Sequence, residues 1–291
     1  MARIVRAITE DGFIRLTLIN SRDIADTAQK YHNTTPVATA ALGRTLTMAA
    51  IMGCNLKNPD HNLTIYIKGD GPLGGIVASA NGAFGVKGYV YNPLCDVPKK
   101  KNGKLDVGGA IGKGYLSVSR DLGLKEPYIG QVPLVTGEIA EDFTYYYAKS
   151  EQTPTAIALG VLVDTDLSVK AAGGFMLQLM PDCDDETAKR LEERVSSLPP
   201  ITELLTKYET EEEIISFILD GFQPKLLDEA IYEYHCDCSM ERIEKALISL
   251  GKKELEDIIN TDGKAELTCQ FCPKTYKLNK DELICLLNSA Q

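Results

Sequence analysis

Two close pairs of cysteines near the end of the chain are the residues best suited to chemistry. The stretch HCDCS contains Cys236 and Cys238, and the stretch TCQFC contains Cys269 and Cys272. Zinc prefers four sulfur ligands in a tetrahedron, usually supplied as two closely spaced pairs that folding brings together. The spacing therefore predicts that these four cysteines bind one zinc ion.

A zinc site closed by four cysteines has no open position for water or substrate, so the metal would be structural rather than catalytic. Its binding energy would then be folding energy for the tail. Metal-bound sulfurs are thiolates, the form that oxidants attack, so the same residues could respond to oxidation. His235 and Cys285 are the substitute ligands that the sequence offers. Four plain thiols in a small core are the alternative to a metal.

The elements of the tail place the second pair in a hairpin turn. An alternating pattern over residues 265–279 predicts two strands with the C-x-x-C stretch between them. A thioredoxin-like dithiol would instead need Cys269 at the start of a helix in a βαβ unit. A thiol-disulfide oxidoreductase therefore remains an alternative function. The remaining predicted elements of the tail are helices over 240–250, 253–260 and 281–290.

The N-terminal part, residues 1–181, predicts an α+β core domain, because its strands come in hairpins rather than alternating with helices. Asn81-Gly82 predicts a type I′ turn inside one hairpin. The predicted strands and hairpins cover 3–19, 62–68, 75–90, 114–120, 155–164 and 167–180, and the predicted helices cover 22–53 and 137–150.

Residues 182–230 predict an acidic linker of short amphipathic helices, and residues 231–291 a small zinc-binding domain. Between Asp184 and Glu229 there are 13 acidic and 5 basic residues. Thr210 and Glu213 form a capping box before an apolar run. Helices this short are marginal alone and depend on packing their apolar faces against another surface.

The charge distribution argues against nucleic acid as a partner. The net charge is −10, and residues 181–291 contain 13 basic against 25 acidic residues. Zinc modules that bind nucleic acid need basic faces. A zinc-ribbon nucleic-acid-binding protein is therefore the weaker alternative. The basic run Val97–Lys104 is interpreted as a solvated turn.

Membrane and nucleotide functions are also disfavoured. The longest apolar run, Val37–Gly53, is short for a membrane span and contains Arg44. Without a recognisable signal peptide, the expected location is the cytoplasm. The GDGPLG stretch at Gly69–Gly74 precedes a predicted hairpin instead of the helix that a dinucleotide fingerprint requires. No Walker sequence indicates use of ATP.

The chain resembles the 33-kilodalton heat-shock protein family, the redox-regulated holdase chaperones of the bacterial cytoplasm. The residues that carry the resemblance are CDC at Cys236–Cys238 and CQFC at Cys269–Cys272. KGDGPLGG at Lys68–Gly75 and AAGGFMLQLMP at Ala171–Pro181 support it. The resemblance covers the full length, in the order core, acidic linker and cysteine-rich tail.

The resemblance implies a chaperone that is not an enzyme and that binds unfolding client proteins without ATP. It implies one zinc ion per chain, held by the four cysteines in the reduced, inactive form. Oxidation is expected to form the disulfides Cys236–Cys238 and Cys269–Cys272 and to release the zinc. The tail and linker are then expected to unfold, and the active form is expected to be a homodimer.

The linker offers a physical reason for such an activity. If the tail unfolds, the short linker helices lose their support, and their apolar faces become exposed. Exposed apolar surface binds non-native chains, while the interleaved acidic residues keep the opened form in solution. The apolar residues concerned are Ile201, Leu204, Leu205, Ile214, Ile215, Phe217, Ile218 and Phe222.

Overall fold

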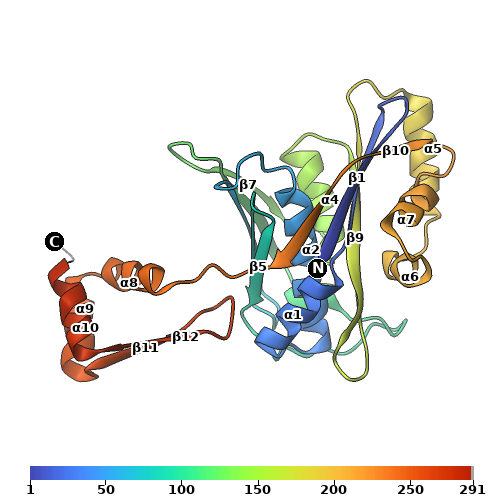
Figure 1. Cartoon of the computed structure of the whole chain (residues 1–291). Helices are drawn as coiled ribbons and strands as arrows, with labels where there is room; N and C mark the ends of the chain where they lie inside the picture. Colours follow the sequence, from blue (N-terminus) through green and yellow to red (C-terminus); the bar gives the residue numbers. More distant parts are fainter. Residues whose placement is uncertain (290–291) are drawn as a thin grey trace. The chain divides into compact units, whose positions relative to one another are not determined.

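The computed structural model describes residues 1–289. The chain forms two compact units, Met1–His235 and Cys236–Gln291 (Figure 1). Residues 182–230, predicted as a linker, belong to the first unit, and the second unit begins at Cys236 rather than at residue 231. The physical reason is β10 (Pro224–Tyr234), which pairs with β1 inside the sheet of the first unit.

A ten-stranded sheet organises the first unit. Its strand order is β7-β6-β3-β4-β5-β10-β1-β2-β9-β8, and the pairing of β5 with β10 is parallel while the other pairings are antiparallel. This sheet, with its helices packed on the faces, confirms the predicted α+β class. The remaining strands are β1 (Ala2–Thr9), β2 (Ile14–Asn20), β3 (Asn62–Gly69), β4 (Gly75–Asn81), β5 (Gly85–Val90), β6 (Gly114–Asp121), β7 (Tyr128–Pro133), β8 (Thr155–Val163) and β9 (Val169–Leu179).

Helix α2 (Pro36–Gly53) lies at the centre of the main hydrophobic core. It contacts β4 and β5 from one half of the sheet and β8 and β9 from the other, so the sheet curves around it. Arg44 interrupts its apolar sequence and forms an ion pair with Glu138 at 2.9 Å. Within the described residues, no helix is long and apolar enough to cross a membrane. Three further helices belong to this part of the unit: α1 (Arg22–His32), α3 (Val107–Ile111) and α4 (Ala140–Lys149).

A second hydrophobic core lies on the opposite face of the sheet. Because alternate residues of a strand point to opposite faces, Ile14, Leu16 and Leu18 of β2 enter this core while Ile19 enters the main one. Figure 1 shows α5, α6 and α7 on this face of β1 and β9, with α2 and α4 on the other. The three covering helices are α5 (Asp185–Ser196), α6 (Ile201–Lys207) and α7 (Glu211–Ile218).

Up to residue 289, the second unit contains three helices and one hairpin around a small core. The hairpin pairs β11 (Lys264–Thr268) with β12 (Thr275–Asn279). The buried apolar residues of that core are Leu247, Leu255, Ile259, Leu278 and Leu283. The helices are α8 (Met240–Ser249), α9 (Lys252–Thr261) and α10 (Lys280–Ser289), and the predicted end of the last helix at residue 290 lies outside the described residues.

The predicted type I′ turn at Asn81-Gly82 is wrong. The positive φ of this turn belongs to Phe84, at 66°, and the turn spans residues 82–84. The Asn81 side chain stabilises it by accepting hydrogen bonds from the backbone N–H groups of Ala83 and Gly85. Gly82 is needed for a different reason, since a Cβ atom there would lie 2.0 Å from the carbonyl oxygen of Asn58.

Candidate metal centre

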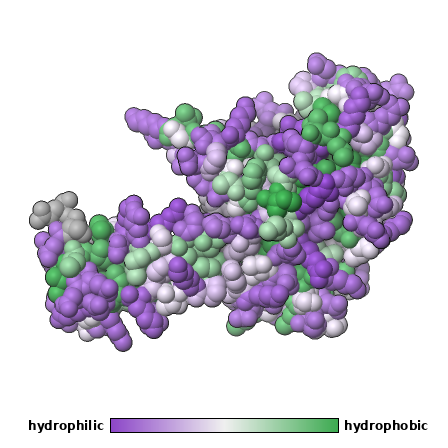
Figure 2. All heavy atoms as spheres, in the orientation of Figure 1, coloured by the Kyte–Doolittle hydropathy of each residue, from purple (hydrophilic) through white to green (hydrophobic). Residues whose placement is uncertain are grey.

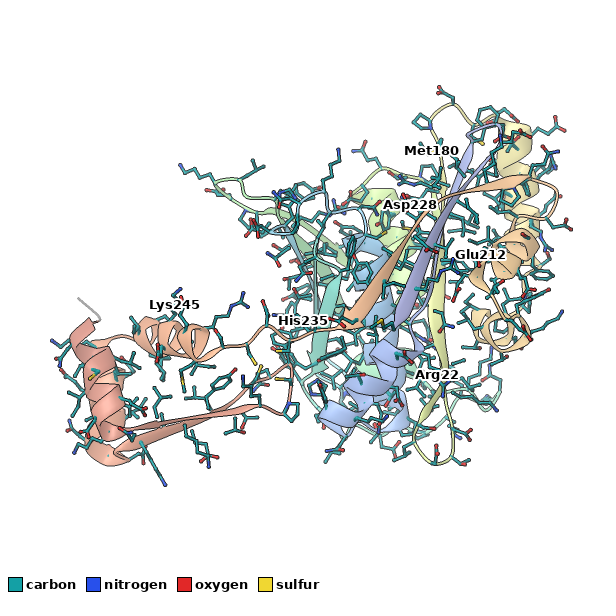
Figure 3. All side chains as sticks on the ribbon, viewed as in Figure 1. Arg22, Met180, Glu212, Asp228, His235 and Lys245 are labelled. Atoms are coloured by element: carbon teal, nitrogen blue, oxygen red, sulfur yellow. The ribbon has the colours of Figure 1, made fainter. Side chains whose placement is uncertain are left out.

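The two cysteine pairs are held by different local structures of the second unit. Cys269 and Cys272 lie in the turn between β11 and β12, and the backbone N–H of Cys269 donates to the carbonyl of Lys274 at 2.9 Å. Cys236 and Cys238 immediately precede α8, whose N-cap Ser239 accepts a hydrogen bond from the backbone of the first helical turn. Figure 3 shows sulfur atoms gathered in the segment that follows His235.

The four sulfur atoms converge on one point. All of them lie within 4.8 Å of one another. The Sγ atoms of Cys236 and Cys269 are 3.7 Å apart, and those of Cys238 and Cys272 are 3.5 Å apart. Four sulfurs in a tetrahedron, each about 2.3 Å from a zinc ion, lie roughly 3.8 Å from one another. The donor set and its spacing are therefore compatible with one zinc ion.

The environment acts differently on the individual thiols. Burial and hydrogen bonding to the other cysteines raise the pKa of Cys236, and burial also raises the pKa of Cys272. Burial acts in the same direction on Cys238, but hydrogen bonds from Tyr276 and the other thiols outweigh it and lower the pKa of Cys238. Without a metal, the thiolate form is therefore most stabilised at Cys238 among these three cysteines.

Tyr276 is a functional residue that sequence reasoning did not identify. Its hydroxyl group donates a hydrogen bond to the Sγ atom of Cys238 at 3.1 Å. The amino group of Lys274 lies 5.1 Å from the centre of the same ring. The backbone N–H of Phe271 points at the Sγ atom of Cys269 at 3.4 Å. Such contacts stabilise negative charge on the sulfurs and orient them.

The substitute ligands do not join the cluster. His235 ends the first unit, where its Nδ1 atom lies 3.7 Å from a carboxylate oxygen of Glu233. Cys285 is exposed on α10. Neither belongs to the group of four sulfurs found among the described residues.

The first unit contains three cysteines outside the cluster, Cys54, Cys95 and Cys183, and they lie in separate surroundings. Cys95 is buried, while Cys54 and Cys183 are partly buried. Burial raises the pKa of Cys54 to about 11, so this thiol is protonated and unreactive at neutral pH.

The hairpin argues against a thioredoxin-like site. A reactive dithiol of that kind places its first cysteine at the N-terminus of a helix, whose dipole stabilises the thiolate. Here Cys269 follows the strand β11, and the chain returns as β12 after the turn. GDGPLG likewise leads into the strand β4 rather than into a helix.

Comparisons with known proteins place these features in one family. The family model described as "Hsp33 protein" matches residues 2–279. The 33 kDa chaperonin of Clostridium beijerinckii is 49% identical over 290 residues, covering 99% of both chains. That of Clostridioides difficile is 50% identical and covers 98% of both chains. The crystal structure of the 33 kDa chaperonin from Thermotoga maritima matches with a TM-score of 0.91 at 40% identity, covering 99% of this chain and 98% of the other.

The fold, the four-cysteine cluster and these matches together define a class, the heat-shock chaperones. Within that class, the chain belongs to the Hsp33 family. The resemblance stated from the cysteine motifs is thereby confirmed.

Proposed function

We propose that this chaperone is an ATP-independent holdase switched by the oxidation of its four clustered cysteines. In the reduced form, Cys236, Cys238, Cys269 and Cys272 bind one zinc ion, and the protein is inactive. Oxidation forms the disulfides Cys236–Cys238 and Cys269–Cys272 and releases the zinc. The formation of each disulfide removes two electrons from a pair of thiolates, and one molecule of peroxide accepts them and is reduced to water, so two molecules of peroxide oxidise one site.

The observation that carries the proposal is the convergence of four sulfurs in a unit with a small core. Five buried apolar side chains form that core. Units this small usually need a metal or a disulfide to fold stably. Loss of zinc would remove on the order of 10 kcal/mol of binding energy from the folded tail. That is comparable to the whole stability of a small domain, so the unit would unfold.

Unfolding of the second unit would reach the first through β10, which runs directly into Cys236. The contact of β10 with β5 is short and covers the two pairs Glu233–Gly85 and Tyr234–Val86. The buried hydroxyl group of Tyr232, on the same strand, has no hydrogen-bond partner among the described residues. The hydroxyl group of Tyr234 donates to the carbonyl of Gly88 at 2.8 Å, so the end of β10 is anchored by a small number of contacts that its release has to break.

Release of β10 and the helices before it would expose the client-binding surface. All eight predicted apolar residues of the linker belong to the second core: Ile201, Leu204, Ile214, Ile215, Ile218 and Phe222 are buried, and Leu205 and Phe217 are partly buried. Leu191 and Leu219 are buried there as well. Figure 2 shows a face that is mostly hydrophilic, with apolar side chains gathered in a few patches. Apolar surface on both the helices and the sheet would then bind unfolding client proteins.

The proposal assigns three roles along the chain. Residues 1–181 form the client-binding and dimerisation core, residues 182–235 the cover and the strand β10 that follows it, and residues 236–291 the redox switch. We further propose that the active form is a homodimer and that it acts in the cytoplasm, where thiols stay reduced until an oxidant appears.

Light scattering of a heat-unfolding client protein tests the proposal. The chain is added either reduced and zinc-loaded or oxidised with peroxide. Suppression of scattering by the oxidised form alone is the expected result. Equal effects of the two forms would leave the zinc as a structural metal only and would overturn the switch. The matched control is Cys285→Ser, which should behave like the unaltered chain because Cys285 lies outside the cluster.

A further inference from the structure

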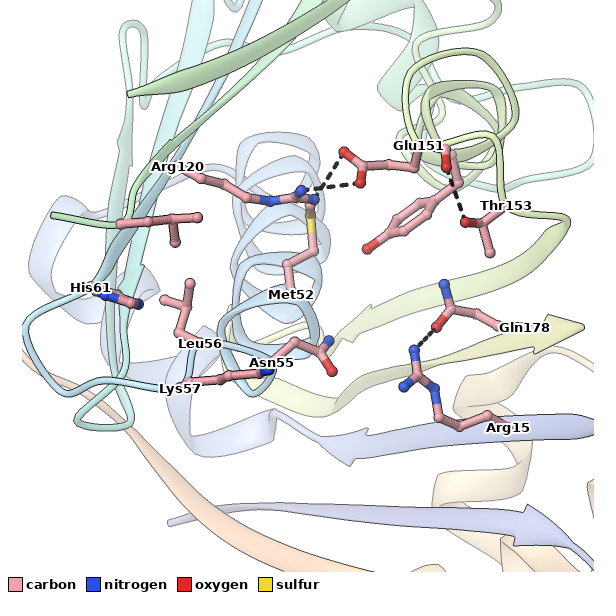
Figure 4. A pocket seen from close by; sticks show the side chains of 12 residues that line it. Arg15, Met52, Asn55, Leu56, Lys57, His61, Arg120, Glu151, Thr153 and Gln178 are labelled. Atoms are coloured by element: carbon pink, nitrogen blue, oxygen red, sulfur yellow. Dashed lines mark hydrogen bonds and ion pairs between the residues drawn. The ribbon is translucent and has the colours of Figure 1, made fainter. Parts of the chain in front are cut away.

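A pocket in the first unit, separate from the cysteine cluster, carries an inference of its own. The cavity has a volume of about 510 Å³ and opens where the two halves of the curved sheet come together around α2 (Figure 4). Arg15 and Gln178 enter it from the adjacent strands β2 and β9, and Arg120 enters from β6. Lys57 comes from the loop after α2.

The charges around this cavity are unbalanced. Arg120 is paired with Glu151, with hydrogen bonds and ion contacts at 3.0 Å. Arg15 donates a hydrogen bond to the neutral side chain of Gln178. Among the described residues, neither Arg15 nor Lys57 forms an ion pair. Three cations and one carboxylate therefore leave two positive charges facing the cavity.

The two unpaired cations are not explained as caps of α2. A helix C-terminus attracts basic side chains because its last carbonyl groups lack partners. The carbonyls of residues 50–53 already accept hydrogen bonds from the chain that follows, namely from the backbone N–H groups of residues 54–56 and from the side chains of Cys54 and Asn55. Capping of α2 therefore does not account for either cation, and Arg15 keeps its positive charge for a ligand because its hydrogen-bond partner Gln178 is neutral.

The rest of the lining combines apolar with polar side chains, namely Met52, Leu56, Leu122 and Tyr147 with Asn55, His61 and Thr153. Met52 and Tyr147 are buried, and Leu56 is partly buried beside them. A cavity of this size, with an apolar wall and a few placed polar groups, is typical of small-molecule sites. We propose that this pocket binds a small organic dianion, such as a phosphate monoester or a dicarboxylate. Its charged group lies between Arg15 and Lys57, and its carbon skeleton packs on Met52 and Tyr147.

Thermal unfolding and calorimetry of the reduced, zinc-loaded full chain test the site. The probe is phenyl phosphate, phenol is its neutral counterpart, and succinate is the dicarboxylate. We expect a saturable rise in Tm with phenyl phosphate and none with phenol, since a ligand that binds the folded state raises its stability. Binding of succinate would identify carboxylates as a ligand source, and binding of phenyl phosphate alone would identify phosphates.

Two variants locate the binding. Arg15→Gln should weaken binding and raise Kd about tenfold, because a charged hydrogen bond is lost. Lys57→Met should weaken it about fivefold, and this exposed position should leave the fold unchanged even where Arg15→Gln does not fold. Lys101→Met, an exposed lysine outside the pocket, is the matched control. No Tm rise with either dianion, an equal rise with phenol, or an unchanged Kd in both variants would overturn the proposal. The zinc switch is unaffected by any of these outcomes.

Discussion

The hydroxyl group of Tyr276 acts on the cysteine cluster from outside it. Because it donates to the Cys238 sulfur at 3.1 Å, it stabilises the thiolate that zinc requires. We expect Tyr276→Phe to weaken zinc binding about tenfold while the hairpin stays folded. Competition with a zinc-chelating dye measures the change. Tyr128→Phe, an exposed tyrosine of the first unit, is the control. Equal affinities of Tyr276→Phe and this control would show that the hydrogen bond does not affect metal binding.

A ligand substitution should have a much larger effect than Tyr276→Phe. Cys272→Ser removes one of the four converging sulfurs, and we expect the purified reduced protein to contain far less than one zinc ion per chain. The second unit should then be unfolded, which NMR would detect as a loss of dispersed signals from residues 236–289. Cys285→Ser should retain full zinc. Stoichiometric zinc in Cys272→Ser would point to another ligand set.

Sequence reasoning located the four cysteines but not Tyr276. The cysteines are readable because their residue type and spacing alone suggest the metal. The role of Tyr276 depends on the register of the hairpin, in which Leu267 pairs with Tyr276, and on which strand face the sulfurs occupy. The disulfide pairing Cys236–Cys238 and Cys269–Cys272 stays a prediction.

Among the elements, α7 and β10 are tied to β1 by one arginine. Arg3 donates to Glu211 at 2.9 Å and to Glu212 at 3.0 Å on α7, and to Glu229 at 2.8 Å on β10. Figure 3 labels Glu212 on α7 and, on β10, Asp228, which precedes Glu229 in the sequence. The network thus joins the cover of the second core to the strand that leads to the cysteines.

Removing this network should loosen the cover without unfolding the chain. We expect Arg3→Gln to lower the free energy of unfolding by about 1 kcal/mol, as for a partly exposed ion pair. Hydrogen exchange of α7 should accelerate more than that of α2. Lys125→Gln, which removes an exposed cation elsewhere, is the control. Unchanged exchange in α7 would mean that apolar packing alone holds the helix.

The same network makes the cover sensitive to acid. The hydrogen bond from Arg3 lowers the pKa of Glu212 in the folded state from its ordinary 4.5. The stabilisation is therefore present above about pH 4.5 and is lost as the pH falls through the lower folded-state pKa. Binding of a hydrophobic dye should rise over that acidic range, and less steeply in Arg3→Gln. Identical pH curves for the two proteins would contradict this role of Arg3.

The elements that the sequence pattern predicted are those with local signals. The hairpins follow from the alternation of apolar and polar residues, and α2 follows from the length of its apolar run. The capping box follows from Thr210 and Glu213, which lie three residues apart. The elements β7, α3 and β10 were not predicted. Most side chains of β10 are exposed, so the strand lacks the alternation of buried and exposed residues. Its partner β1 also lies far away in the chain, since Arg3 pairs with Ile231. A pairing of such range leaves no local trace in the sequence.

For the whole molecule, the division into two units predicts two separable unfolding events. A chelator applied to the reduced chain should abolish the transition of the second unit and lower the temperature of the first, because the release of β10 loosens the helices that cover the second core. Differential scanning calorimetry measures both, and added zinc should restore the lost transition. A single transition that moves as a whole on zinc removal would instead show that the two units unfold together.

The pairing of the first strand with the last strand of its unit also affects how the protein is made. On the ribosome, β1 is synthesised long before its partner β10, which is completed only at Tyr234. At 5 to 20 residues per second, this wait lasts roughly 10 to 45 s. One edge of the nascent β1 stays open throughout, and an open strand edge invites aggregation. Arg3 and Arg6 lie along that edge, so the charges that later pair with Glu229 and Asp228 first protect the unfinished chain.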